Sequence, residues 1–290
     1  MVWTTVGIVL QLIFLEGILS IDNAAVLGAM VSTLPDDRPI AWPPALHGLG
    51  AILQPLAGNQ RTAALRVGLL GAYVGRGTML VLASLVIQNP WLKIIGALYL
   101  VRLAFENLGM AESGEEAQFE QAHQLKAFWV VVLNVELADL IFSLDNVVAA
   151  VSLSKTLWVV MIGVAIGIVT MRFAAGLFAQ AILKEPILKP AAYVLVLNIG
   201  VQLLLEELFQ VEIPDLARFG ISVAIIALAL LYARSRLLQR GRPVLVWLAQ
   251  GMDTVNELFN WALAPLRFGL RTAGALFRRL LGKARPRPAE

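Results

Sequence analysis

The 290-residue chain contains no cysteine and only two histidines, and charged residues occupy 15% of its positions. The absence of cysteine excludes disulfide bonds, thiolate metal ligands and a cysteine nucleophile within the chain. Hydrophobic residues make up 59% of the chain, and its mean hydropathy is +0.76. Soluble domains carry about 45–50% apolar and about 25% charged residues. The composition therefore indicates a polytopic membrane protein.

Long apolar runs predict an all-α fold, because a helix that crosses the hydrocarbon core needs about 20 apolar residues. About seven transmembrane helices are expected, at about residues 4–32, 67–88, 91–108, 127–152, 157–180, 190–210 and 217–234. The first run is longer than the apolar region of a signal peptide and contains Glu16. We therefore expect it to stay in the protein.

Three polar patterns occur twice in the same order. Acid-x-x-x-Ser-x-Asp-Asn is found at residues 16–23 and 139–146, Gly-x-x-x-Gly-x-x-Thr-Met at 71–79 and 163–171, and Leu-x-x-Glu-x-Leu at 103–108 and 203–208. The order predicts two three-helix repeats. Because each repeat has an odd number of crossings, the second enters from the opposite side, as in the inverted repeats of secondary transporters. The spaced glycines are expected to let helices pack closely.

The repeats divide the chain into five parts. Residues 1–108 form the first repeat, with a proline-rich loop at 34–61, and residues 127–210 form the second. Between them, residues 109–126 form an acidic linker, and 211–240 hold a seventh helix outside the repeats. Residues 241–290 form a basic amphipathic tail, expected to lie on anionic lipid headgroups. Nucleic acid is not an expected partner.

Lysines and arginines are distributed unevenly between the two sides of the predicted bundle. One side holds Arg38, Arg61, Arg66, Lys126, Lys184 and Lys189 together with the basic tail, and the other holds Lys93, Lys155 and Arg218. Positive charge is enriched in cytoplasmic loops. This predicts a plasma-membrane protein with an external amino terminus and a cytoplasmic carboxyl terminus.

Acidic residues inside the apolar runs define the candidate site. A charge at the bilayer centre costs about 2.5–3.5 kcal/mol even on the lenient insertion scale, so such residues usually serve transport. Helical spacing places Glu136, Asp139, Ser143 and Asn146 on one stripe, and Glu16, Ser20 and Asn23 on another. Asp22 and Asp145 fall beside these stripes. They would turn inward if both helices unwound at mid-membrane, which Gly17 eases in the first helix and Leu140 disfavours in the second.

Three arginines also lie in the predicted spans, but they cannot balance all the acids. Counting Glu106 and Glu206, the predicted spans contain seven carboxylates. They contain three arginines, Arg76, Arg102 and Arg172. We expect Arg76 and Arg172 to be local counterions of an empty site. Glu106 and Glu206 would lie at opposite ends of the bundle, either as gates or as interfacial charges. The excess negative charge predicts that protons or cations neutralise the site.

The ligand chemistry indicates a hard divalent cation, because every candidate donor is an oxygen and both histidines lie in predicted loops. Carboxylate and carbonyl ligands suit Mg²⁺, Ca²⁺ or Mn²⁺. The predicted ligands are Glu16, Asp22, Asn23, Glu136, Asp139, Asp145 and Asn146, with Ser20 and Ser143 as weak or supporting ligands. These residue types do not separate the three metals.

The paired motifs Glu16-Gly-Ile-Leu-Ser-Ile-Asp22-Asn23 and Asp139-Leu-Ile-Phe-Ser-Leu-Asp145-Asn146 resemble the TerC family of integral membrane proteins over about residues 8–235. The segment at residues 64–72 and the seven predicted helices support the resemblance. It implies export of Mn²⁺ from the cytoplasm, with the paired motifs as the metal site. No organic cofactor is implied.

Other functions are weighed against this one. A Ca²⁺ or other divalent cation/proton exchanger would use the same acids, and a channel is a lesser rival. An intramembrane aspartic protease is disfavoured, because each Asp is followed by Asn in a symmetric array, so we expect no enzyme. A membrane scaffold that acts through its tail, or a homo-oligomer, is compatible with the sequence.

Overall fold

The computed structural model describes residues 2–14, 16, 20–37, 40, 42, 58–81, 89–110, 124–154, 156–211 and 213–240, and then residues 243, 247, 248, 250–252, 254, 255 and 257. The described part is helical and has no strand, as the apolar runs predict. Its helices are α1 (Val2–Ile13), α2 (Ile21–Ser32), α4 (Gln60–Val81), α6 (Pro90–Met110), α8 (Gln124–Leu153), α9 (Leu157–Lys184), α10 (Leu188–Phe209), α11 (Asp215–Arg234) and α12 (Arg236–Gln239).

Local capping chemistry explains several of these bounds. The side-chain oxygen of Asn59 accepts a hydrogen bond from the backbone N–H of Thr62 at 2.8 Å, which caps the start of α4. Asn89 caps α6 in the same way through the N–H of Trp91 at 3.2 Å, and Pro90 follows it at the first helical position. Helix α10 ends at Phe209, and the next residue, Gln210, has a left-handed φ of 56°.

The predicted spans correspond to helices, with two differences. Helix α4 begins seven residues before the apolar run at 67, because Asn59 caps it there. The first predicted span is divided: α1 ends at Ile13 and α2 begins at Ile21. Gly17, expected to ease this break, lies outside the described residues.

The paired break that would turn both Asp22 and Asp145 inward does not form, because α8 is continuous from Gln124 to Leu153, as Leu140 favours. The Ser143 hydroxyl donates to the Asp139 carbonyl one turn earlier, a bond that fits inside an unbroken helix. Leu140 stands where the first helix has Gly17, and leucine favours the helix. The two acidic motifs therefore lie on helices of different shape.

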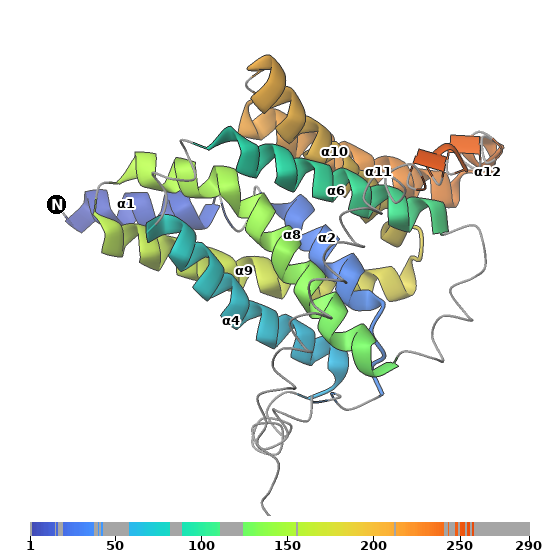
Figure 1. Cartoon of the computed structure of the whole chain (residues 1–290), viewed down its shortest axis with the longest axis horizontal. Helices are drawn as coiled ribbons and strands as arrows, with labels where there is room; N and C mark the ends of the chain where they lie inside the picture. Colours follow the sequence, from blue (N-terminus) through green and yellow to red (C-terminus); the bar gives the residue numbers. More distant parts are fainter. Residues whose placement is uncertain are drawn as a thin grey trace, which may run out of the picture.

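Long helices lie side by side (Figure 1). The helices that flank or carry the acidic motifs each pack against a helix with spaced glycines, α4 or α9. Helices α1 and α2 pack on α9, and α8 packs on α4. Helix α10 packs on α6 and also contacts α2 and α11. The largest buried cluster joins apolar residues of α2, α4, α6, α8, α9 and α10. The candidate site lies within this packing.

Glycines provide the close approach that the sequence predicts. A Cβ on Gly163 would lie 2.7 Å from the Leu12 side chain, and one on Gly167 would clash with Glu16. On the other pair of helices, a Cβ on Gly71 would clash with Glu136, and one on Gly75 would lie 3.0 Å from Leu140. The missing side chains therefore bring α4 and α9 against the helices that carry the acids.

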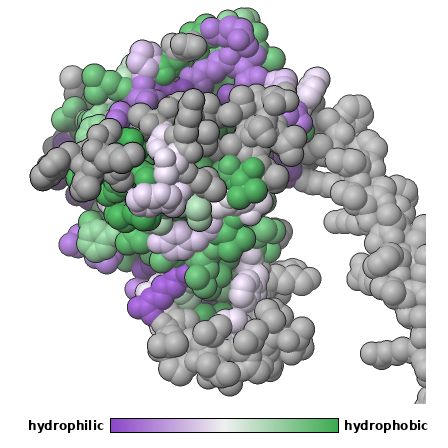
Figure 2. All heavy atoms as spheres, turned by 90° about the vertical axis from the view of Figure 1, so that its left-hand side faces the viewer, coloured by the Kyte–Doolittle hydropathy of each residue, from purple (hydrophilic) through white to green (hydrophobic). Residues whose placement is uncertain are grey.

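Apolar side chains also cover much of the outside. Figure 2 shows hydrophobic residues across the middle of one face of the molecule, with hydrophilic residues near its upper edge and at its lower left. Large apolar side chains are exposed along α4, α9 and α11, among them Val74, Phe173 and Leu228. Faces of this kind suit contact with lipid acyl chains.

Three helices of the described part are long and apolar enough to cross a membrane, with bounds Trp158–Lys184, Leu188–Phe209 and Asp215–Arg234. Helices α4, α6 and α8 have 22, 21 and 30 residues and carry more polar groups. Their lengths suffice for a crossing at about 1.5 Å per residue. The count of seven crossings is not confirmed and remains a prediction.

Candidate functional site

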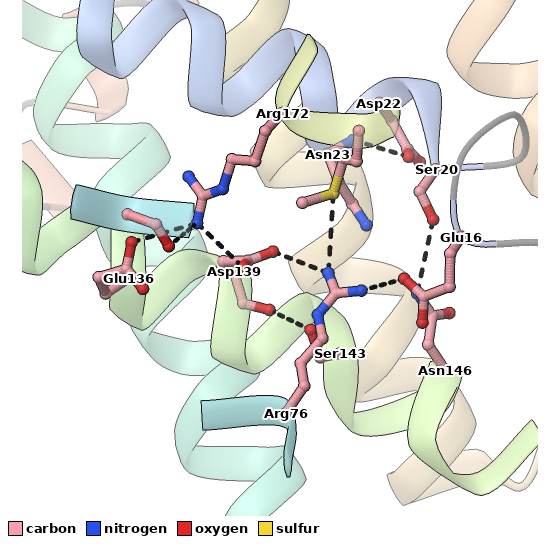
Figure 3. Close-up of polar contacts among 12 residues, drawn as sticks. Glu16, Ser20, Asp22, Asn23, Arg76, Glu136, Asp139, Ser143, Asn146 and Arg172 are labelled. Atoms are coloured by element: carbon pink, nitrogen blue, oxygen red, sulfur yellow. Dashed lines mark hydrogen bonds and ion pairs between the residues drawn. The ribbon is translucent and has the colours of Figure 1, made fainter. Parts of the chain in front are cut away.

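A buried arginine on α4 lies between acids from both halves of the chain. The guanidinium of Arg76 forms an ion pair with Glu16, just beyond α1, and another at 2.8 Å with Asp139 on α8. Its Nη2 also lies 3.7 Å from the Met171 sulfur. The side chains of Arg76, Glu16 and Asp139 are at most 3% exposed. The structure thus joins the two predicted acidic motifs through one guanidinium (Figure 3).

A second arginine, Arg172 on α9, extends this chain of charges. Its Nη2 lies 3.1 Å from Asp139 Oδ2 and 3.1 Å from Glu136 Oε1, and it donates to the Gly68 carbonyl at 2.9 Å. Each oxygen of Asp139 therefore faces a different arginine. The result is an alternating row of acid and base, Glu16–Arg76–Asp139–Arg172–Glu136, which we call the charge network (Figure 3).

The charge network lowers the cost of holding ions inside apolar helices. Ion pairs and hydrogen bonds compensate part of the desolvation of each carboxylate and guanidinium. With all five groups ionised, the three carboxylates outnumber the two guanidiniums by one. The network can therefore accept positive charge.

Asp22 points away from the charge network. Its Oδ1 accepts a hydrogen bond from the Asn23 N–H at 2.8 Å, and its Oδ2 accepts one from the Ser222 hydroxyl on α11 at 3.1 Å. Asp22 is 9% exposed and lies in the first turn of α2. The hydrogen bond to Ser222 directs the carboxylate toward the seventh helix, α11.

A hydrogen bond directly joins polar residues of the two acidic motifs. The Asn146 amide donates to the Ser20 hydroxyl at 3.4 Å, which connects α8 to the residue before α2. Asn23, Ser20 and Ser143 are buried, and Ser143 is bonded to its own helix. The side chain of Asp145 lies outside the described residues.

Glu106 and Glu206, the two acids predicted as gates, take no part in the ion pairs of the charge network among the described residues. Glu206, near the end of α10, forms an ion pair with Arg218 on α11, and its neighbour Glu207 lies 3.6 Å from Lys93 on α6. Glu106 is half-buried near the end of α6. Glu206 thus ties two helices together, and its role as a gate remains a prediction.

The predicted metal ligands whose side chains the structure describes do not form a metal-binding cluster. Among the described residues, no group of three or more histidine, aspartate or glutamate side chains is arranged to hold a metal ion. The guanidiniums of Arg76 and Arg172 lie between the carboxylates instead.

Two contributors to the site escaped the sequence interpretation. Ser222 reaches Asp22 from a helix outside the repeats, and its only signal was a hydroxyl in an apolar run. Gly68 supplies a carbonyl to Arg172 and lies against its guanidinium. A backbone acceptor has no signature in side-chain patterns.

The buried charges, the helical fold and the exposed apolar faces define an integral helical membrane protein. The profile of the "Integral membrane protein TerC family" matches residues 49–242, and the chain belongs to this family. The match begins after the first acidic motif, whereas the resemblance found by motif extends from about residue 8.

Curated bacterial relatives agree with this family. The chain is 35% identical over 230 residues to the uncharacterized membrane protein YceF of Bacillus subtilis, covering 78% of this chain and 80% of the relative. It is 34% identical to YkoY of the same organism, covering 71% and 62%, and 29% identical to the inner membrane protein YgdQ of Escherichia coli, covering 73% and 84%. No solved structure matches the chain.

Proposed function

We propose that the protein is a divalent cation carrier that exports Mn²⁺ from the cytoplasm by alternating access, and that it is not an enzyme. The charge network carries this proposal. Its five ionisable groups, four of them buried and Glu136 half-buried, are held by four separate segments of the chain, so a change in helix packing would change the site. Buried charges in membrane helices commonly mark ion pathways.

The chemistry of the acceptors supports a hard cation as substrate. The network and its surroundings offer carboxylate, hydroxyl and amide oxygens, from Glu16, Asp139, Glu136, Ser20 and Asn146. Such ligands suit Mn²⁺, Ca²⁺ and Mg²⁺. The choice of Mn²⁺ follows the family resemblance of the paired motifs.

The helix contacts are consistent with two inverted three-helix repeats. In the proposed arrangement, α1 with α2, α4 and α6 correspond to α8, α9 and α10. The first helix of each repeat packs on the second helix of the other, and the two third helices, α6 and α10, pack together. This exchange brings Glu16 and Asp139, the first acids of the two motifs, to the same guanidinium of Arg76.

The proposed location is the plasma membrane, with the amino terminus outside. The distribution of lysine and arginine supports this orientation. Export would then carry the cation from the side of Lys184 and Lys189 to the side of Lys93 and Arg218.

Metal uptake by inside-out proteoliposomes tests the function. Mn²⁺, Ca²⁺, Mg²⁺ and Zn²⁺ are compared with and without a pH gradient, for the wild type, Asp139→Asn and the control Glu207→Gln, whose acid pairs with Lys93 outside the charge network. We expect Mn²⁺ uptake by the wild type and the control, and its loss in Asp139→Asn. Absence of flux for every ion would reject the carrier, and flux of Ca²⁺ alone would favour a calcium exchanger.

A further inference from the structure

Charge balance limits how a divalent cation can enter the charge network. Three ionised carboxylates and two guanidiniums leave one excess negative charge. A divalent cation added to all five groups would leave an excess positive charge, whereas a divalent cation that replaced one guanidinium would leave none. Neutral sites cost least inside a membrane. The balance therefore favours exchange of one arginine for the metal.

The guanidiniums of the two arginines differ in how many of their N–H groups are paired. Arg76 is 1% exposed and uses Nη1 for Glu16 and Nη2 for Asp139. Arg172 makes its polar contacts through Nη2, and its buried Nη1 has no hydrogen-bond partner among the described residues. The Nε of both arginines also has none there, so Nη1 is the atom that distinguishes Arg172. Buried donors without acceptors are unfavourable. Its partner Glu136 is also 22% exposed, so this end of the network is less buried than the Glu16 end.

We propose that Arg172 is a tethered counter-cation, which occupies the place of the substrate between Asp139 and Glu136 and leaves it when a divalent cation binds. The inference rests on the proposed function and names the competitor in that site. Arg76 stays with Glu16 and Asp139 as a permanent counterion. The return of Arg172 to the two carboxylates would then help to release the cation.

Removal of the competitor should strengthen metal binding. The measurement is titration of purified protein in lipid nanodiscs with Mn²⁺, with free Mn²⁺ followed by electron paramagnetic resonance. We expect Arg172→Gln to bind Mn²⁺ about tenfold more tightly than the wild type, within the usual range of coupling between two sites. The control Arg61→Gln, whose guanidinium pairs with the surface acid Asp36, should match the wild type.

Flux separates tighter binding from better transport. In proteoliposomes, Arg172→Gln should hold Mn²⁺ and turn over more slowly than the wild type, because nothing returns to displace the cation. Arg172→Lys is the second variant. It keeps the positive charge, but one ammonium group lacks the planar fork that bonds two carboxylates, so its Mn²⁺ affinity should lie between the other two.

Each outcome decides one question. Unchanged or weaker Mn²⁺ affinity in folded, monodisperse Arg172→Gln overturns the tethered counter-cation. If that variant does not fold, wild-type affinity in Arg172→Lys overturns it. These results leave the carrier intact when the wild type itself binds and transports Mn²⁺. Failure of the wild type and every variant to bind or move any divalent cation rejects the proposed function instead.

Discussion

Gly68 has no side chain at the point where α4 passes the Glu136 carboxylate and the Arg172 guanidinium. A Cβ there would lie 2.6 Å from Glu136 Oε1 and 2.9 Å from Arg172 Nη1. Gly77, on the same helix, has no heavy atom within 4 Å of a Cβ position. The two glycines therefore provide a matched pair for testing whether the charge network is tightly packed.

We predict that Gly68→Ala lowers the free energy of unfolding by about 1–3 kcal/mol, as overpacking does in close-packed interiors. Gly77→Ala should leave it unchanged or raise it by up to about 1 kcal/mol through helix propensity. Thermal unfolding of both variants in the same detergent measures the difference. Equal stability of the two alanine variants would show that the charge network accommodates a methyl group at Gly68 without overpacking.

At the scale of the element, the seventh helix is attached to the acidic motif by a hydroxyl. Ser222 is a fully buried residue of α11, and it bonds to Asp22 on α2. Further polar ties from α11 are the partly exposed ion pair of Arg218 with Glu206 and the more exposed ion pair of Arg234 with Glu185. Most of α11 offers apolar side chains to its surroundings. The Asp22 contact therefore has a large share in fixing its position.

Ser222→Ala should loosen α11, because it removes a hydrogen bond to a buried carboxylate, a bond worth about 1.5–3 kcal/mol. Hydrogen exchange of the α11 backbone should become faster near residue 222. Thr170→Ala is the control, since among the described residues the hydroxyl of the half-buried Thr170 bonds only the Ile166 carbonyl of its own helix α9. Unaltered exchange in α11 would mean that apolar packing alone holds the helix.

The sequence predicts the bounds of the helices better than it predicts whether a helix breaks at an acidic motif. Apolar runs give the bounds of α6, α8, α10 and α11 to within a few residues, because lipid requires such runs. The break after α1 agrees with a glycine in a polar motif, but the same motif in α8 does not break, since Leu140 and the Ser143 bond favour a helix.

The site was predictable in its residue types and only partly in its geometry. Arg76 and Arg172 lie beside acids, as expected of counterions, but their position between the carboxylates depends on how α4 and α9 pack. The direction of Asp22 depends on α11, which has no counterpart in the repeats. Spacing along one helix gives the face of a residue, while its partner on another helix is set by tertiary packing.

At the scale of the whole molecule, the proposed orientation places the two ends of α10 on opposite sides of the membrane. Lys184 lies at the end of α9, just before α10, and Gln210 directly follows α10. Both are exposed, and the 22 residues of α10 between them span about 33 Å. The chain has no native cysteine, so single-cysteine variants can be labelled without background.

We predict that a membrane-impermeant thiol reagent added to intact cells labels Gln210→Cys and not Lys184→Cys. After the membrane is permeabilised, both variants should be labelled, which serves as the control for accessibility. Labelling of Lys184→Cys alone in intact cells would invert the topology and turn the proposed exporter into an importer. Labelling of both would show that α10 does not cross the membrane.

The basic tail separates a carrier from a scaffold. The charge network lies among residues 16–172, and no residue beyond 240 takes part in its contacts within the described part of the chain. A carrier without residues 241–290 should therefore keep its Mn²⁺ flux in proteoliposomes, although its attachment to anionic vesicles should weaken, because each basic residue near such a surface contributes about 1 kcal/mol. Asp139→Asn in the full chain is the opposite control, with the tail intact and the flux lost. If the truncated protein loses its metal phenotype while Asp139→Asn keeps it, the tail and not the charge network carries the function.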